Sequence, residues 1–306
     1  MQTPRLKIGT RGSPLALWQA EETRRSLIAA HGFGEDEIAV VPITTTGDRI
    51  RDRPLAEIGG KGLFTKEIEE ALLSGEIHMA VHSMKDMPAA LPDGLEIAAL
   101  LPREDARDAF LSPRAMSLKD LPEGAVIGSS SVRRSAQALR LRPDLKVVQF
   151  RGNVETRLRK LAEGVADATF LAAAGLNRLG HSGKITALMD EDEMLPAVAQ
   201  GAIGIEIRSD DAATRALLAA ITHHETEIAI ACERAFLAAL DGSCRTPLAG
   251  HARLVQGMLY FRGHALTADG RQCFETTREG APADAARMGR EAGEEVKRDG
   301  GAAIAF

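Results

Sequence analysis

One cysteine of this chain stands in a setting that suits nucleophilic chemistry. Cys244 lies in the segment 240–247, where Gly242 and Ser243 precede the sulfur and a proline ends the run. Gly, Ser and Pro do not easily continue a helix, so we expect a loop with an accessible thiol. Arg245 beside it favours the thiolate, which is the nucleophilic form. Taken alone, the segment favours a loop cysteine without a role, and only the rest of the chain can change that interpretation.

A second group with chemical potential follows a predicted strand. Residues 77–81 form a buried-type apolar run, and Lys85 and Asp86 come shortly after it. In open α/β sheets, ligands gather at the carboxyl ends of the strands. A lysine there supplies a cation, and a carboxylate can transfer a proton or hold an N–H group. A plain surface ion pair between the two side chains remains the alternative.

Basic and hydroxyl side chains recur where predicted strands meet predicted helices between residues 121 and 159. This segment has eight Lys or Arg and three Asp or Glu, although the whole chain has a net charge of −5. Such junctions converge on one cleft in a parallel sheet, and guanidinium groups bind carboxylates and phosphates through two parallel bonds. Several arginines in one cleft would repel one another unless anions fill it, so we expect a ligand with several acidic groups; a solvated basic face is the alternative. The residues are Ser129, Ser130, Ser131, Arg133, Arg134, Arg151 and Arg157.

A third candidate lies near the N-terminus. Residues 6–9 are predicted to form a strand, and Ser13 and Pro14 are typical N-cap and first-turn residues of a helix. Unpaired N–H groups at a helix N-terminus bind anions, and Arg11 would add a charged fork. A helix that is capped only for stability explains the same residues.

The composition excludes several classes of protein. With 306 residues, 44% of them hydrophobic and 26% charged, the chain is typical of a globular protein of two or three domains. It lacks an apolar run of about 18 residues or more and a signal-like N-terminal stretch, so we expect neither a membrane span nor export. The net charge disfavours a general nucleic-acid binder. We therefore expect a cytoplasmic location, with neither nucleic acid nor membrane as a partner.

Metal-ligand spacing is absent from the sequence. Cys232, Cys244 and Cys273 are too few and too scattered for a disulfide framework, and none has a neighbour at metal-binding spacing. The His-His-Glu run at 223–225 falls in a predicted helix, where adjacent side chains point apart. We therefore expect no metal, and we expect Cys232 in a helix and Cys273 in a strand to be inert packing residues.

The order of predicted elements indicates an α/β protein. Two successive units alternate strands with helices, and residues 102–105 and 195–201 are candidate crossovers, giving a hinged pair of lobes with a cleft. A strand at 203–207 could return to the first sheet, and residues 49–62, rich in charge and glycine, would be a lid. The predicted fold is two α/β lobes with mixed, mostly parallel sheets, followed by a small α+β domain. The expected domains are residues 1–101 with 199–219, residues 102–198, and residues 220–306.

Seven short segments together resemble the hydroxymethylbilane synthase (porphobilinogen deaminase) family. Any one of them is weakly specific, but seven in the right order are highly specific, and they span nearly the whole chain. They lie at 10–16 (Thr-Arg-Gly-Ser-Pro-Leu-Ala), 59–64, 80–86 (Ala-Val-His-Ser-Met-Lys-Asp), 128–134, 151–154, 195–198 and 240–247.

The resemblance implies a fold and a reaction. Members have two lobes like those of periplasmic binding proteins and a third domain that bears the cysteine. The implied transferase condenses four porphobilinogen molecules head to tail, with loss of ammonia, onto a dipyrromethane cofactor, and hydrolysis then releases hydroxymethylbilane. By this resemblance a thioether joins the cofactor to Cys244. The enzyme would be monomeric and would act in tetrapyrrole and haem biosynthesis.

The resemblance also assigns roles to residues. Asp86 would be catalytic: it would hold pyrrole N–H groups and stabilise the cationic azafulvene formed when ammonia leaves, and we expect it to be buried near cations that keep it ionised. The arginines would bind the acetate and propionate groups of the growing chain. Cofactor ligands would be Cys244, Ser83, Lys85, Asp86, Ser129, Ser130, Ser131, Arg133, Arg134 and Arg151, and substrate ligands would be Arg11, Ser13, Gln19, Phe64, Arg151, Arg157 and Gln200.

Three positions depart from the family pattern. Ser243 and Ala199 stand where glycine is usual, and the serine run 129–131 stands where Thr-Ser-Ser is common. These changes keep size or hydroxyl character, so we expect the function to be kept.

Two other functions remain open on the sequence. A solute-binding or ligand-sensing protein of the same two-lobed fold would need the arginines but neither Cys244 nor Asp86, and fold alone does not decide between them. A thiol acyltransferase would use Cys244 but needs a base, and His251 is merely the nearest histidine downstream. An intact mass above the bare sequence mass would favour the enzyme.

Overall fold

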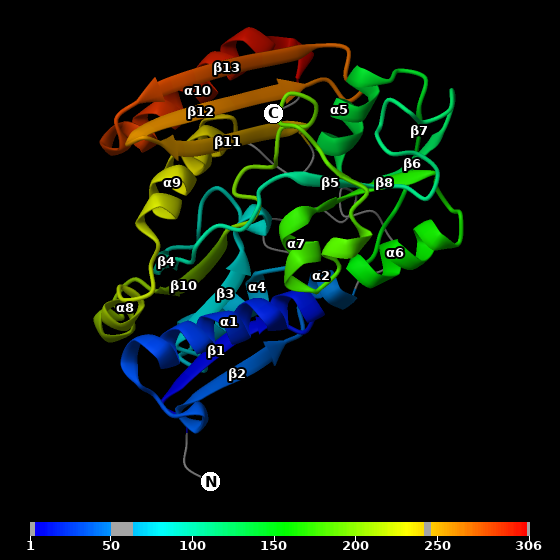
Figure 1. Ribbon diagram of the computed structural model, residues 1–306. Helices are drawn as coiled ribbons and strands as arrows, with labels where there is room; N and C mark the ends of the chain where they lie inside the picture. The colour runs from blue at the N-terminus through cyan, green and yellow to red at the C-terminus, as the bar shows by residue number, and fades with distance from the viewer. Residues whose placement is uncertain (1–3, 50–63, 242–245, 305–306) are drawn as a thin grey trace. The chain divides into compact units, whose positions relative to one another are not determined.

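The computed structural model describes residues 4–49, 64–241 and 246–304, and three β-sheets organise them (Figure 1). Contacts group the chain into two compact units. The first unit comprises Met1–Arg103 and Ala202–Glu227, and the second comprises Glu104–Gly201 and Ile228–Phe306. Both units are discontinuous in sequence, because the chain leaves the first unit and later returns to it. The division into three domains stays a prediction.

A five-stranded mixed sheet forms the centre of the first unit. Its elements are β1 Leu6–Arg11, β2 Ile38–Ile43, β3 Met79–Ser83, β4 Leu95–Leu100 and β10 Ile203–Arg208, with helices α1 Pro14–His31, α2 Thr46–Arg49, α4 Lys66–Leu73 and α8 Ala212–Leu218 and the 3-10 turns η1 Glu35–Glu37 and η2 Met84–Asp86. The strand order is β2-β1-β3-β10-β4; β1 is parallel to β2 and β3, and β10 is antiparallel to β3 and β4. Met79 and Val81 join an apolar cluster with α1 and α8, whereas Ala80 joins one with α4. Because successive strand residues face opposite sides, helices cover both faces of the sheet.

A second five-stranded sheet forms part of the second unit. Its elements are β5 Asp108–Leu111, β6 Val126–Gly128, β7 Lys146–Val148, β8 Ala168–Ala172 and β9 Ala187–Leu188, with α5 Val132–Leu141, α6 Val154–Ala162, α7 Ala173–Arg178 and the 3-10 turn η3 Ser182–Lys184. The order is β7-β6-β8-β5-β9, with β6 parallel to β7 and β8, and β5 antiparallel to β8 and β9. Both lobes therefore have the predicted mixed sheets.

A three-stranded antiparallel sheet completes the second unit. It consists of β11 Leu248–Val255, β12 Met258–Leu266 and β13 Cys273–Gly280, accompanied by α9 His224–Ala239, α10 Ala285–Gly300 and the 3-10 turns η4 Pro282–Asp284 and η5 Gly301–Ala303. Helix α10 packs on β12 and β13. It also approaches α9 closely, because a Cβ on Gly289 would lie 2.0 Å from the carbonyl oxygen of Cys232. Only glycine permits this approach, which holds the small α+β arrangement together.

Most predicted elements are present, but several differ. The strand predicted at 77–81 lies two residues later, at Met79–Ser83, and β5, β9 and α7 were not predicted. Strand β5 has four residues, follows a charged stretch and begins with an acidic residue, Asp108, so it carries no alternating pattern. The expected lid at 49–62 lies almost wholly outside the described residues.

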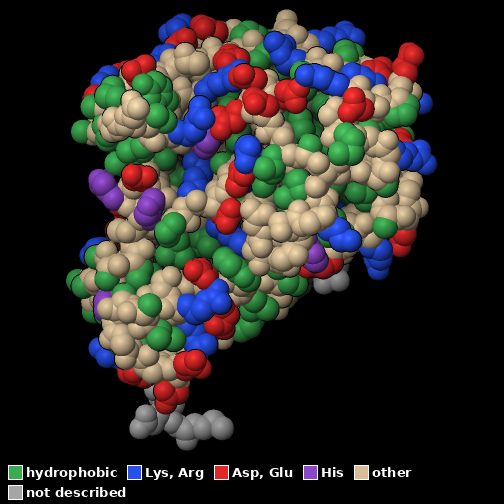
Figure 2. Space-filling view, in the orientation of Figure 1, with side chains coloured by type: hydrophobic (Ala, Val, Ile, Leu, Met, Phe, Trp, Pro, Cys, Tyr) green, Lys and Arg blue, Asp and Glu red, His purple; other side chains and the backbone are tan. Residues whose placement is uncertain are grey.

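The surface and the helices carry little that is unusual. Acidic and basic side chains are interspersed over the face seen in Figure 2, as 38 basic and 43 acidic residues lead us to expect. None of the helices in the described ranges combines the length and the apolar character that crossing a bilayer requires.

Candidate active site

The carboxyl ends of β1 and β3 border a small cavity of about 60 Å³ in the first unit. The first turn of α1 completes its wall, so it occupies the place where open α/β sheets bind ligands. Six predicted site residues, from distant parts of the sequence, are brought together here. They are Arg11, Ser13, Gln19, Phe64, Ser83 and Asp86.

Two side chains shape the part of the wall that α1 supplies. Ser13 is the N-cap of α1, and its hydroxyl accepts a hydrogen bond from Ala16 N at 3.4 Å, which confirms the predicted helix start. Gln19 is 2% exposed, and its Nε2 has no hydrogen-bond partner within the described chain. A buried amide without a partner costs free energy. A ligand in the cavity that accepts this bond would recover that cost.

A buried methionine fixes the turn that carries Lys85 and Asp86. Met84 donates its N–H to Ala202 O at 3.0 Å, and its side chain packs so tightly that a Cβ on Gly204 would lie 2.1 Å from Met84 Sδ. Because the turn directs Met84 inward, Lys85 is half-buried and Asp86 is exposed. The predicted burial of Asp86 is therefore wrong. The Asp86 carboxylate lines the cavity and bonds to none of the described residues.

Arg11 is held by a carboxylate that the sequence analysis did not single out. Asp48 accepts from Arg11 Nη2 at 2.5 Å and from Arg11 Nε at 3.3 Å, and the Phe64 ring centroid lies 4.2 Å from the guanidinium carbon. Burial acts to raise the pKa of Asp48, but hydrogen bonds from Arg11 and Thr45 outweigh burial and hold this pKa below its usual value. Phe64, expected to be a substrate ligand, here stacks on Arg11. The two partners orient Arg11 in the cavity wall.

A buried acid–base pair that sequence reasoning missed lies at the same cavity. His82 Nε2 is 2.9 Å from Glu206 Oε2, and both side chains are buried. Glu69 of α4 is buried close to them; burial, and then the charge of Glu206, raise the pKa of Glu69. The available signal was a glutamate inside the apolar run 203–207, since a charged group in a buried strand needs a partner.

The arginines of the second unit surround an internal acid, Asp108. This fully buried carboxylate lies 2.6 Å from Arg134 Nη2 and 2.7 Å from Arg133 Nη1. Gln200 Nε2 also donates to Asp108 at 3.1 Å, and to Ala106 O at 2.7 Å. Burial acts to raise the pKa of Asp108, but the charges of the two arginines outweigh it and hold this pKa far below the usual range.

Asp108 corrects part of the electrostatic argument from the sequence. Arg133 and Arg134 were expected to repel the other arginines unless a ligand supplied anions, yet the protein itself supplies one carboxylate to both. Arg133 also donates to Leu195 O at 2.7 Å and Arg134 to Phe170 O at 3.1 Å. The signal that could have found Asp108 is the acidic residue that opens the apolar run 108–111.

The serine turn between β6 and α5 orders the start of that helix. Ser131 is the N-cap and accepts from Arg134 N at 3.4 Å, and Ser129 Oγ accepts from Ser131 N at 3.2 Å. Exposed Ser130 donates to Gln149 Oε1 at 3.0 Å and accepts from Phe150 N at 2.9 Å. The three hydroxyls thus hold the turn at the carboxyl end of β6, where a ligand is expected.

Two further predicted ligands, Arg151 and Arg157, lie near the start of α6. Both side chains are half-buried, and Arg157 Nε donates to Gly152 O at 2.9 Å. Cys244 lies outside the described residues. His251, the base of the acyltransferase alternative, is buried with Nδ1 3.0 Å from Glu191 Oε1.

Comparison with known proteins assigns the chain to a family. Residues 6–216 match the family model "Porphobilinogen deaminase, dipyromethane cofactor binding domain", and residues 228–298 match "Porphobilinogen deaminase, C-terminal domain". The chain belongs to the porphobilinogen deaminase family. Porphobilinogen deaminase of Nitrobacter hamburgensis is 58% identical over 294 residues, covering 96% of this chain and 93% of that protein. The Paracoccus denitrificans protein of the same name is 58% identical over 292 residues, covering 95% and 93%. The family resemblance stated from seven segments is thereby confirmed.

The solved structures that the chain resembles include periplasmic proteins of bacteria. The periplasmic VFT2 domain of Bordetella pertussis BvgS matches 71% of this chain and 86% of its own at 16% identity, with a TM-score of 0.42. An ABC-transporter periplasmic substrate-binding protein from Coxiella burnetii matches 71% and 91% at 15% identity, with a TM-score of 0.43. A likeness at this level says nothing about a ligand.

The donor set of the porphobilinogen deaminase chain fits a dipyrromethane with acidic side groups. Pyrrole N–H groups need an acceptor, and the exposed Asp86 carboxylate is one without a partner in the described chain. Acidic side groups need donors, and the amide of Gln19, which has no partner in the described chain, is one.

Proposed function

We propose that this member of the porphobilinogen deaminase family condenses four porphobilinogen molecules on a dipyrromethane bonded to Cys244, with Asp86 as the catalytic carboxylate. Ammonia is lost at each addition, and hydrolysis releases hydroxymethylbilane. The observation that carries the role of Asp86 is its exposed carboxylate at the end of β3, in one cavity with Arg11 and Ser13. A bound dipyrromethane would supply the pyrrole carbon to which the first unit is joined.

The chain's own residues bind and orient the reacting groups. Asp86 accepts hydrogen bonds from pyrrole N–H groups and stabilises the positive charge that develops when ammonia leaves the substrate, since a preorganised carboxylate favours developing cationic charge. Arg11, kept in place by Asp48 and Phe64, binds a substrate carboxylate. Ser13 and Gln19 are further substrate ligands in the same wall.

The second unit supplies binding groups for the acidic side groups of the cofactor and of the growing chain. Cofactor ligands from this unit are Ser129, Ser130, Ser131, Arg133, Arg134 and Arg151, and substrate ligands are Arg151, Arg157 and Gln200. Asp108 holds Arg133 and Arg134 in fixed positions, so they are positioned before a ligand arrives. The first unit contributes Ser83 and Lys85. We further propose that the enzyme acts in the cytoplasm as a monomer and binds neither nucleic acid nor membrane.

Intact-mass measurement tests the proposal directly. The protein purified from a haem-producing host should exceed its bare sequence mass by the mass of one dipyrromethane, and Cys244→Ser should remove that excess. Cys232→Ala, which removes a buried thiol elsewhere, should keep it. A parent protein at its bare sequence mass would favour the solute-binding alternative and would contradict the attachment.

A further inference from the structure

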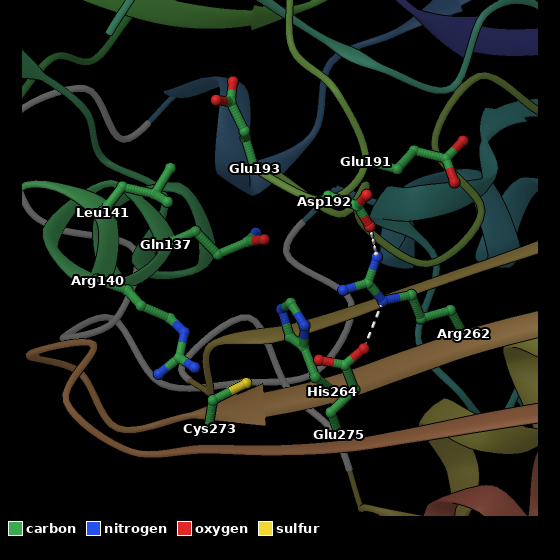
Figure 3. A pocket seen from close by; sticks show the side chains of 10 residues that line it. All are labelled: Gln137, Arg140, Leu141, Glu191, Asp192, Glu193, Arg262, His264, Cys273 and Glu275. Atoms are coloured by element: carbon green, nitrogen blue, oxygen red, sulfur yellow. Dashed lines mark hydrogen bonds and ion pairs between the residues drawn. The ribbon is translucent and has the colours of Figure 1, made fainter. Parts of the chain in front are cut away.

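A second cavity, of about 140 Å³, lies within the second unit, and its lining includes none of the residues assigned to the reaction above. Its walls come from the C-terminal part of α5, the loop at 191–193 and the facing strands β12 and β13 (Figure 3). Its lining is unusual in combining a thiol, an imidazole and carboxylates.

The register of the C-terminal sheet places three potential metal ligands on one face. His264 of β12 pairs directly with Glu275 of β13, and Cys273 lies two residues before Glu275. Side chains directly opposite, and those two apart along a strand, project from the same face. One ligand atom from each residue lies within 4.8 Å of the others. Spacing in the sequence did not reveal this cluster, because the pairing register of β12 and β13 brings its members together.

His264 provides an independent sign that the cavity takes a ligand. Its side chain is 6% exposed and points into the cavity, and its Nε2 has no hydrogen-bond partner in the described chain (Figure 3). A buried polar nitrogen without a partner is costly.

Charged side chains of both signs surround the cavity. Four carboxylates line it, from Glu191, Asp192, Glu193 and Glu275, against two guanidinium groups from Arg140 and Arg262. Arg262 is already bound to Asp192, and its Nε donates to Glu275 Oε1 at 2.5 Å. The other oxygen of Glu275 has no bond within the described chain and is available to a ligand.

We propose that His264, Cys273 and Glu275 bind a borderline-soft divalent metal ion of the Zn²⁺ class. Imidazole, thiolate and carboxylate are the ligands that Zn²⁺ takes, at about 2.0–2.1 Å for nitrogen and about 2.3 Å for sulfur. Small side-chain movements close the present spread of ligand atoms to those distances. The Cys273 thiol loses its proton to solvent when the metal–sulfur bond forms. Three protein ligands leave a fourth position for water, and the ion would tie β12 to β13.

Titration of the metal-free holoenzyme with Co²⁺ tests this site. The protein, without a histidine tag and treated with a chelator, should bind one equivalent of Co²⁺ and show a thiolate-to-cobalt charge-transfer band that added Zn²⁺ abolishes. Cys273→Ala should lose the band. In His264→Gln and Glu275→Gln, Zn²⁺ affinity should fall by at least about tenfold, since even an indirect ligand contact is worth about 10–100-fold.

Matched variants separate this site from other thiols. Cys232→Ala removes a buried cysteine outside the cavity and should keep both the band and the affinity. If the proposed cofactor attachment failed, Cys244 would be a free thiol. Any band that it produced would survive in Cys273→Ala, so this failure is distinguishable from failure of the metal site. A parent without the band, or a Cys273→Ala variant with parental Zn²⁺ affinity, would overturn the proposal. Melting curves recorded without metal identify any variant that does not fold. If another variant fails to fold, Cys273→Ala decides the test, because Cys273 is only half-buried.

Discussion

The Asp86 carboxylate faces its cavity without a protein partner, and this state suits a group that must bind something else. We expect Asp86→Asn to keep the fold and part of the bound cofactor but to lose about 10²-fold or more of its turnover, which is the usual contribution of one acid–base group. Steady-state turnover, intact mass and melting together measure this. Asp93→Asn, which removes another exposed acid of the first unit, is the control and should be near parental. Near-parental turnover in Asp86→Asn would refute the assigned role.

Asp108 differs from Asp86 because its function is to pair charges inside the protein. Asp108→Asn would leave Arg133 and Arg134 buried without their anion, so we expect a loss of about 3–5 kcal/mol in the free energy of unfolding. Because the folded state lowers the pKa of Asp108, its stabilisation is present above the ordinary aspartate pKa of about 3.9 and is lost as the pH falls further. The deficit of the variant should therefore shrink in acid.

Urea denaturation at several pH values measures this effect. Glu163→Gln, which removes an exposed partner of Arg159 in the same unit, should cost less than about 1 kcal/mol. An Asp108→Asn variant as stable as Glu163→Gln at neutral pH would show that the arginines do not depend on this acid.

At the scale of elements, the sequence predicted what local patterns encode. The N-cap at Ser13 and the strand at 203–207 were located correctly, because capping residues and apolar runs are local signals. Strand β5 was missed because its signal is four residues long and Asp108 interrupts its apolar character. The exposure of Asp86 was missed because it depends on Met84 packing against Gly204, a contact across more than a hundred residues. Roles in the site came from the family resemblance, and partners such as Asp48 could come only from the fold.

The meeting of α4, β3 and β10 has a pH dependence of its own. Glu69 is buried on α4 beside the pair formed by His82 and Glu206, and its pKa is raised above the usual value. A raised pKa means that this carboxyl favours folding while protonated, and that this contribution is lost as the pH rises from the unfolded value through the folded one. We expect Glu69→Gln to be more stable than the parent at pH 7, with the difference vanishing near pH 4.

Thermal melting across this pH range measures the crossover. Glu70→Gln, at the exposed neighbouring position, should show no such pH-dependent gain. A Glu69→Gln variant that is less stable than the parent at pH 7 would mean that the charged form of Glu69 is favoured by its surroundings, and the sign argued here would be wrong.

At the scale of the whole molecule, cofactor and fold are linked. A ligand that binds only the folded state stabilises it, and the acidic groups of a dipyrromethane would offset clustered guanidinium charges that Asp108 alone does not balance. We expect Cys244→Ala to be inactive, to lack the cofactor mass and to melt at least about 2 °C lower, since 1 kcal/mol corresponds to about 2–4 °C in chains of this order. Cys232→Ala and Cys273→Ala control for thiol loss and should keep cofactor mass and activity. Because the metal proposed at Cys273 is removed from both parent and variants before melting, a lower melting temperature of Cys244→Ala alone reports the cofactor. If Cys244→Ala matched the parent in melting and turnover, neither the anchoring nor its coupling to stability would hold.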